Sequence, residues 1–251
     1  MSKYKSEFLR IEKKYLLNNF QCQAILDAIS KHMTEEKYGT HKISNIYYDT
    51  ANFQLIRASI EKPLYKEKLR LRAYGSVTDE SNVFVEIKKK FKGVVYKRRV
   101  GLTLDNARKF LNENQRQFDK VQVLREAECM LNLYNLIPKA AISYDRIAFF
   151  GNDDPEFRLT IDKNLKGRLS NLDLTEGTFG EEIIGQDKRL MEIKTTGGMP
   201  IWMCYLLSEF KIYPTGFSKY GEFYKNYVLN TSNIKDIETN YLFEKEMVKS
   251  A

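Results

Sequence analysis

The chain has few of the residues on which metal and nucleophile sites are usually built. It contains three cysteines and two histidines in 251 residues, and neither type has the C-x-x-C or H-x-x-x-H spacing of a zinc site. Cys22, Cys129 and Cys204 are odd in number and lie in apolar-periodic stretches, so we expect reduced thiols in the core. A disulfide scaffold and a zinc enzyme are both disfavoured.

The chain also lacks membrane and nucleotide-loop signatures. No apolar run approaches the ~18 residues that cross a bilayer, and Met1–Arg10 has no apolar core of a signal peptide. G-x-x-x-x-G-K-[ST], G-x-G-x-x-G and G-x-S-x-G are all missing. We therefore expect a cytoplasmic protein without direct membrane insertion, in which any phosphate site is not a P-loop.

The composition is that of a globular protein with a cationic excess. Hydrophobic residues make up 43% of the chain, and 41 Lys and Arg against 33 Asp and Glu give a net charge of +8. This excess indicates a polyanionic partner: nucleic acid, anionic membrane or phosphate. No linker or repeat divides the chain, so we predict one domain over residues 1–230 and a polar C-terminal tail over 231–251.

Hydrophobic periodicity predicts an α+β fold with eight antiparallel strands. Helices are expected over Phe20–Met33, in two pieces over Leu104–Leu136, over Pro200–Lys211 and from about Ser218, whereas Asn171–Asp187 is expected to be a loop. The predicted strands are Phe8–Leu17, Ile43–Asp49, Lys66–Tyr74, Asn82–Lys90, Val94–Leu102, Ala140–Phe150, Phe157–Leu165 and Arg189–Thr195.

Charged and apolar side chains alternate inside these strands. Side chains two residues apart point to the same face, so each strand has one charged and one apolar face. Leu69, Leu71, Val85 and Ile87 are typical of the apolar face. The charged face carries Glu12, Lys14, Arg70, Arg72, Glu86, Lys88, Lys90, Lys97, Arg99, Tyr144, Arg146, Arg158, Thr160, Asp162, Glu192 and Lys194.

The charged face has two interpretations. It could be the solvated side of an amphipathic sheet, but it is rich in arginine and places cations side by side, which is unfavourable unless an anion lies between them. The arginine fork suits two phosphate oxygens. We therefore predict a barrel with a cationic interior and helices over its apolar outside. A nucleic-acid partner is not expected, since alternation divides the runs Lys88–Lys92 and Lys97–Arg99 between two faces.

Carboxylates among the cations leave a choice open. Glu12, Glu86 and Glu192 could form ion pairs that hold the cations in place. They could equally be oxygen ligands for Mg²⁺ or Mn²⁺ that bridges phosphate oxygens.

Seven ordered motifs between about Phe8 and Val228 resemble a known family. The chain is similar to the VTC domain, the polyphosphate polymerase branch of the CYTH-like triphosphate tunnel metalloenzymes. The motifs are Glu12-Lys13-Lys14-Tyr15, Lys68–Gly75, Phe84–Lys88, Tyr144-Asp145-Arg146, Arg158–Asp162, Met191–Lys194 and Phe217–Tyr220, and Ile46–Asp49 also looks like the family's early strand.

The resemblance implies an eight-stranded antiparallel tunnel barrel with flanking helices, in which a metal-dependent enzyme makes polyphosphate from the γ-phosphate of ATP. By motif position, Lys219 would hold phosphate with Ser218 and Tyr144 assisting, and Glu192 would bind Mn²⁺ or Mg²⁺. To these the charged face adds Lys90 and Arg99 for phosphate and Glu12 and Glu86 for metal. The implied catalytic, phosphate-holding residues are Lys14, Arg70, Arg72, Lys88, Lys97, Arg146, Arg158 and Lys194.

Two positions depart from the patterns of related proteins. Arg10 replaces the first glutamate of the E-x-E-x-K motif that opens the CYTH-type triphosphatases, which favours the polymerase branch. Gly216 stands where eukaryotic VTC domains tend to have a basic residue, so one phosphate contact at the tunnel mouth is in question. The alternatives are a triphosphatase or nucleoside triphosphatase using the same tunnel, and a non-catalytic polyphosphate or nucleotide sensor. Polymer that leaves through a membrane would require a separate membrane partner.

Overall fold

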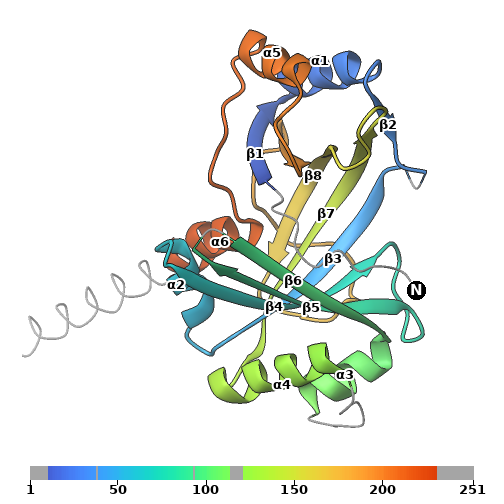
Figure 1. Cartoon of the computed structure of the whole chain (residues 1–251). Coiled ribbons are helices and arrows are strands. Elements are labelled where there is room, and N and C mark those ends of the chain that lie inside the picture. Colours follow the sequence, from blue (N-terminus) through green and yellow to red (C-terminus); the bar gives the residue numbers. More distant parts are fainter. Residues whose placement is uncertain (1–10, 38, 93, 114–120, 231–251) are drawn as a thin grey trace, which may run out of the picture.

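The computed structural model describes residues 11–37, 39–92, 94–113 and 121–230. This part of the chain forms one large antiparallel sheet with helices packed on its outside (Figure 1). The strands are β1 (Ile11–Asn18), β2 (Met33–Glu35), β3 (His41–Asp49), β4 (Tyr65–Tyr74), β5 (Asn82–Phe91), β6 (Val94–Thr103), β7 (Ile137–Gly151), β8 (Arg158–Arg168), β9 (Glu181–Glu182) and β10 (Lys188–Thr195). The helices are α1 (Asn19–Ile29), α2 (Gln54–Ile60), α3 (Leu104–Asn112), α4 (Gln122–Tyr134), α5 (Ile201–Glu209) and α6 (Lys219–Phe223), which continues as a π-helix over Tyr224–Leu229.

Eight strands follow one hydrogen-bonded path, in the order β1-β10-β8-β7-β3-β4-β5-β6. These are the eight predicted strands. The short strands β2 and β9 pair beside β7 and β8, so the sheet has ten strands in the described chain, two more than predicted. They have only three and two residues, too few to show an alternation that the sequence could reveal.

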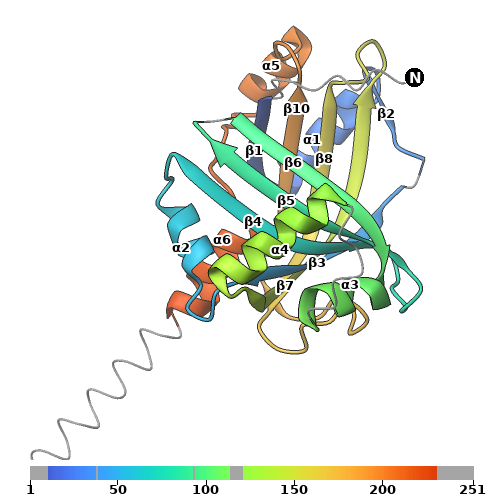
Figure 2. The same cartoon turned by 60° about the horizontal axis from the view of Figure 1, so that its bottom comes forward.

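The sheet curls until β4, β5 and β6 cross in front of β8, β10 and β1 (Figure 2). Its end strands, β1 and β6, share no ladder within the described residues. The prediction of an antiparallel sheet with flanking helices is confirmed, but the closed barrel is wrong, because the sheet stays open. Alternation decides which face points inward; whether two edges meet depends on strand tilt and stagger.

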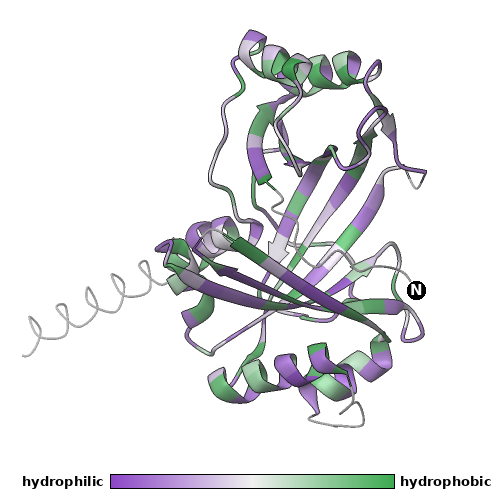
Figure 3. Cartoon of the chain, viewed as in Figure 1, coloured by the Kyte–Doolittle hydropathy of each residue, from purple (hydrophilic) through white to green (hydrophobic). Residues whose placement is uncertain are grey.

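Helices cover the apolar outer face of the curled sheet. Helices α3 and α4 pack over β4 and β5, where Leu69, Leu71, Val85 and Ile87 are almost fully buried. Helices α1 and α5 cover β1, β8 and β10 at the other end. Hydrophilic and hydrophobic residues alternate along the strands in Figure 3, so the sheet buries one side of each strand and leaves the other for polar chemistry.

A third cluster fixes α2 and α6 to β3 and β7. At the end of β3 the buried Asp49 accepts hydrogen bonds from the backbone of Leu55 and Ile56 at the start of α2, and from the hydroxyl of Tyr220 in α6 (3.1 Å). Burial, partly offset by these hydrogen bonds, raises the pKa of Asp49. Helix α2 was not predicted, whereas α6 begins at Ser218 as its N-cap, as expected.

The cysteine prediction is only partly correct. All three thiols are free, but Cys22 alone is buried, while Cys129 and Cys204 are exposed on their helices. Apolar neighbours in sequence do not fix which side of a helix a cysteine occupies. Arg10 and the predicted tail, residues 231–251, lie outside the described residues. None of the described helices has both the length and the apolar character needed to cross a membrane.

Candidate functional site

The inner face of the sheet brings cations from distant segments around Glu192. Lys14 of β1 is its partner across the ladder, and their Nζ and Oε1 atoms are 3.7 Å apart. The ammonium of Lys219, at the start of α6, donates to Oε1 over 3.1 Å. Arg146 and Lys194 lie 3.6 and 3.8 Å from Oε2. Burial opposes ionisation of Glu192, but these four cations outweigh it and hold its pKa well below the usual range.

Asp162 is a second carboxylate at this position, and we did not predict it as a site residue. It is 0% exposed and accepts a bidentate hydrogen bond from Arg146 Nε and Nη2, at 2.6 and 2.7 Å. Lys219 Nζ is 2.6 Å from Oδ2, the oxygen that also accepts from Arg146 Nη2. Its alternation with Arg158 and Thr160 already placed it on the charged face, so the strand pattern contained the signal.

A second group of cations surrounds Glu86 of β5. Arg70 donates to Oε2 from Nε and Nη2 at 2.7 and 2.6 Å, Arg72 lies 3.7 Å away, and Lys97 Nζ is 2.8 Å from Oε1. Burial opposes ionisation, but Arg70, Arg72 and Lys97 lower the pKa of Glu86 to about 2. Burial also lowers the pKa of Lys97 to about 8, although Glu86 acts against it.

Tyr144 connects the two groups. Its hydroxyl accepts from Arg72 Nη2 (3.3 Å), and its ring faces the Arg146 guanidinium at 5.2 Å and the Lys219 ammonium at 4.5 Å. Burial acts to raise the pKa of Tyr144, but Arg72, Arg146 and Lys219 together lower it to about 8. A phenol among three cations is suited to hydrogen bonding with an anion.

Two further side chains orient the arginines and were missed in the sequence. Asn45 of β3 accepts from Arg72 Nε (2.9 Å) while its own amide donates to the carbonyl of Ile142. The hydroxyl of Tyr47 accepts from Arg70 Nη1 at 3.2 Å. Both side chains are neutral, and a charge-based search does not select them.

Glu12 and Lys88 meet across the interior. Lys88 projects from β5 and Glu12 from β1, and their charged atoms are 4.0 Å apart. Lys14 lies 3.4 Å from the same carboxylate. Because β1 is one end of the sheet path and β5 is next to the other end, this pair shows that the two walls face each other over a narrow space.

Other predicted residues have partners different from Glu192. Arg158 is 49% exposed and pairs with Glu36 (3.7 Å). Arg99 is exposed and stacks over Phe84 at 4.8 Å. Lys90 is half-buried opposite Lys66. Ser218 Oγ accepts from Lys68 Nζ (3.1 Å) and from the backbone of Gly221. None of these contacts Glu192 directly in the described structure.

The carboxylates fit a divalent cation to different degrees. No group of three or more His, Cys, Asp and Glu gathers in the described residues. Glu12 and Glu192 face the same space. Burial and the negative charge of Glu192 both act to raise the pKa of Glu12, but Lys88, Lys14 and Lys194 outweigh them and lower it. Mg²⁺ is commonly held by one or two carboxylates plus substrate phosphates, which these two could provide. Glu86 is already neutralised by three cations.

Sequence comparison decides the family. The profile of the VTC domain matches residues 9–228, nearly the whole chain. The chain belongs to the VTC domain family. The predicted resemblance to the VTC domain is therefore confirmed. No functionally curated protein sequence matches the chain.

Two solved structures support the fold. A provisionally assigned adenylate cyclase from Bacillus halodurans is 15% identical with a TM-score of 0.55, over 88% of this chain and 98% of that one. HpAC1 from Hippeastrum, a provisionally assigned adenylyl cyclase described as having a dominant triphosphatase activity, is 17% identical with a TM-score of 0.53, over 86% and 96% of the two chains. At this identity the likeness shows a shared architecture.

Proposed function

We propose that this VTC domain is a polyphosphate polymerase that transfers the γ-phosphate of ATP to a growing polyphosphate chain. The observation that carries the proposal is the convergence of cations from separate strands and α6 on one narrow interior, where Arg146, Lys14 and Lys219 surround Glu192 and Arg70 and Arg72 surround Glu86. A polyphosphate chain is the kind of ligand that such a density of cations neutralises.

Phosphoryl transfer requires positioning and charge neutralisation more than a protein nucleophile. A terminal oxygen of the acceptor chain forms a bond to the γ-phosphorus as the bond to the β-γ bridging oxygen breaks, and ADP leaves. Arg72 and Arg146 would hold the transferred phosphoryl group, because both guanidinium groups contact Tyr144, Arg72 at its hydroxyl and Arg146 over its ring. Lys14 and Lys219 would exchange their carboxylate partners for phosphate oxygens.

Glu192 and Glu12 would hold Mn²⁺ or Mg²⁺, which neutralises charge on the triphosphate when bound. The chain's own contribution is to keep these carboxylates ionised. The low pKa of Glu192 and the lowered pKa of Glu12 leave both groups unprotonated at neutral pH, so neither must lose a proton to accept a metal.

The test is incubation of the protein with labelled ATP and each divalent metal, with polymer, orthophosphate and nucleotide resolved on one gel. We expect a phosphatase-sensitive polymer with Mn²⁺ or Mg²⁺, and no polymer from Glu192→Gln or Arg72→Ala. Polymer at the wild-type level from folded samples of both variants would refute the assignment.

Hydrolysis is the second candidate, because a structural neighbour with the same fold, HpAC1, is described by its triphosphatase activity. In this reaction water replaces the acceptor chain and the same gel shows orthophosphate without polymer. Tight triphosphate binding without turnover would instead identify a sensor. A cytoplasmic location and a separate membrane partner remain predictions.

A further inference from the structure

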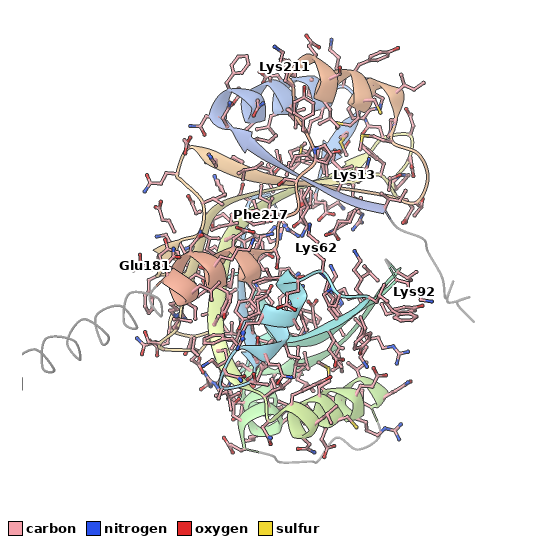
Figure 4. The ribbon with its side chains drawn as sticks, turned by 90° about the vertical axis from the view of Figure 1, so that its left-hand side faces the viewer. Lys13, Lys62, Lys92, Glu181, Lys211 and Phe217 are labelled. Atoms are coloured by element: carbon pink, nitrogen blue, oxygen red, sulfur yellow. The ribbon has the colours of Figure 1, made fainter. Side chains whose placement is uncertain are left out.

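Carboxylates divide the interior into two parts. In one part, each cation cluster has a carboxylate partner. These carboxylates are Glu12, Glu86, Asp162 and Glu192, and they pair with Lys14, Lys97 and Arg146. Towards the start of β4 and the end of β5, the inner face instead presents Lys66, Lys68 and Lys90, with Lys66 opposite Lys90 in the ladder. We call these three residues the lysine end. Figure 4 views the molecule from this side, with Phe217 and Lys62 labelled near its centre.

Lys68 is the clearest member of the lysine end. Its side chain is half-buried, and its ammonium donates to Ser218 Oγ over 3.1 Å. No carboxylate lies within 4.0 Å of it among the residues that the structure describes. Arg70, two residues along the same strand, has Glu86 at 2.6 Å. Two neighbouring inward side chains of β4 therefore differ: Arg70 has a carboxylate partner and Lys68 has a hydroxyl partner.

Cations without a counter-ion are costly in this environment. Burial, and then the charges of Lys14, Lys66, Lys88 and Arg70, lower the pKa of Lys68 to about 7. Burial, Lys90, Lys62 and Lys14 also lower the pKa of Lys66. Lys66 donates to the carbonyl of Ser59 (3.2 Å), a neutral acceptor. An anion bound among these groups would reduce the electrostatic repulsion between their positive charges.

We propose that the lysine end binds the acceptor polyphosphate chain without metal, while the part around Glu192 and Glu12 binds the donor triphosphate with its divalent cation. The reason is charge balance. A metal-free polyanion is repelled by carboxylates and attracted by unpaired cations, whereas a metal-bound triphosphate brings a cation for which carboxylates are ligands. This inference rests on the proposed polymerase function and adds which part of the tunnel holds which substrate.

The test measures binding of two probes by calorimetry. Metal-free inorganic polyphosphate longer than three units is titrated in the presence of chelator, and ATP is titrated with Mn²⁺. Removing one charged contact costs roughly tenfold in affinity, so we expect Lys68→Met to weaken polyphosphate binding by about that factor and to leave Mn²⁺-ATP within about twofold. Lys13→Met is the matched control, because Lys13 is exposed on the outer side of β1 and should alter neither.

Equal polyphosphate affinity of Lys68→Met and wild type would overturn the proposal. Loss of Mn²⁺-ATP binding as large as the loss of polyphosphate binding would overturn it too, because Lys68 would then belong to the donor site. The binding assay does not depend on turnover. A protein that makes no polymer would refute the polymerase function, but the two probes would still show whether metal-free polyphosphate and Mn²⁺-ATP bind to different parts of the interior. Lys68→Arg, which keeps the charge, should bind polyphosphate better than Lys68→Met; equal weakness of the two variants would count against the proposal.

Discussion

The two faces of strands β4 and β5 differ more than any two separate regions of the molecule. On the outer face Leu69, Leu71, Val85 and Ile87 are at most 3% exposed beneath α3 and α4. On the inner face Arg70, Arg72 and Glu86 form an ion-pair network. The outer face supplies hydrophobic stabilisation, so the inner face can keep like charges together at a cost to stability. Alternate residues of one strand therefore serve two purposes: those on the outer face stabilise the fold, and those on the inner face are available to bind a ligand.

The largest effect should come from breaking the inner network at its most buried point. Asp162→Asn removes the charge that faces both Arg146 and Lys219, and loss of one partner of a buried pair costs about 3–5 kcal/mol. Urea unfolding measures this. Added inorganic triphosphate should restore more stability to the variant than to wild type, because it replaces the lost negative charge.

Asp105→Asn is the control for this prediction. Asp105 pairs with Lys109 on the solvent side of α3, where solvent screening leaves such a pair little effect on stability. Equal destabilisation by Asp105→Asn and Asp162→Asn would show that burial of the inner network is not what matters.

The outer face should affect folding and not binding. Leu71→Ala removes a side chain that is 3% exposed in the core under α3 and α4, which costs about 2–5 kcal/mol. The folded fraction should still bind triphosphate with nearly wild-type affinity. A large loss of affinity per folded molecule would mean that the two faces are not independent.

The reverse separation is expected for Arg72→Met. Arg72 contacts Asn45, Tyr144 and Glu86 on the inner face, and charge-assisted hydrogen bonds contribute about 1.5–3 kcal/mol each. Triphosphate affinity should fall roughly tenfold to a hundredfold, measured by calorimetry. Arg98→Met, which removes the partner of Glu126 on the outer face of β6, should leave affinity unchanged.

The smallest effect is a dependence of stability on pH. The pKa of Tyr144 is lowered to about 8, so the folded protein binds fewer protons at this site than the unfolded chain, whose tyrosines titrate near ~10. Its contribution to stability therefore increases as the pH rises from about 8 towards ~10 and is absent below the lower value. Phenolate absorbance and urea unfolding should show this in wild type. Tyr144→Phe should remove the phenolate that forms near pH 8 and reduce the gain in stability, while Lys97, whose lowered pKa acts in the same pH range, keeps part of it. Identical titration of the two proteins would contradict the prediction.

Strand alternation predicted the inner face well because it depends only on chain geometry. Lys14, Arg146 and Glu192 were expected to share an interior, and they meet there although they lie on β1, β7 and β10. Lys68 and Asp162 have the same alternation as the selected residues and could have been found with them. The residue pattern did not reveal side-chain partners: Arg158 and Arg99 are ladder partners of Lys194 and Glu86, but their side chains contact Glu36 and Phe84 instead.

Features that depend on pairing across long distances were beyond the sequence. Helix α2 packs against α6, and Asp49 joins the two because it accepts from the backbone of Leu55 and Ile56 and from the distant Tyr220 hydroxyl. The choice between ion pairs and metal ligands for Glu86 turned on Arg70, Arg72 and Lys97 reaching one carboxylate. The missing ladder between β1 and β6 has no local sequence marker, because any strand edge can pair or stay open.

Within the described residues no hydrogen-bonded ladder joins β1 to β6, so the curled sheet is open along this edge. A ladder would fix the two walls at the backbone spacing of about 4.8 Å between neighbouring strands, whereas in the described residues they face each other through side chains, as in the 4.0 Å contact of Lys88 with Glu12. Under the proposed function, a bound phosphate chain that contacts both walls would connect β1 and β6 through its own oxygens.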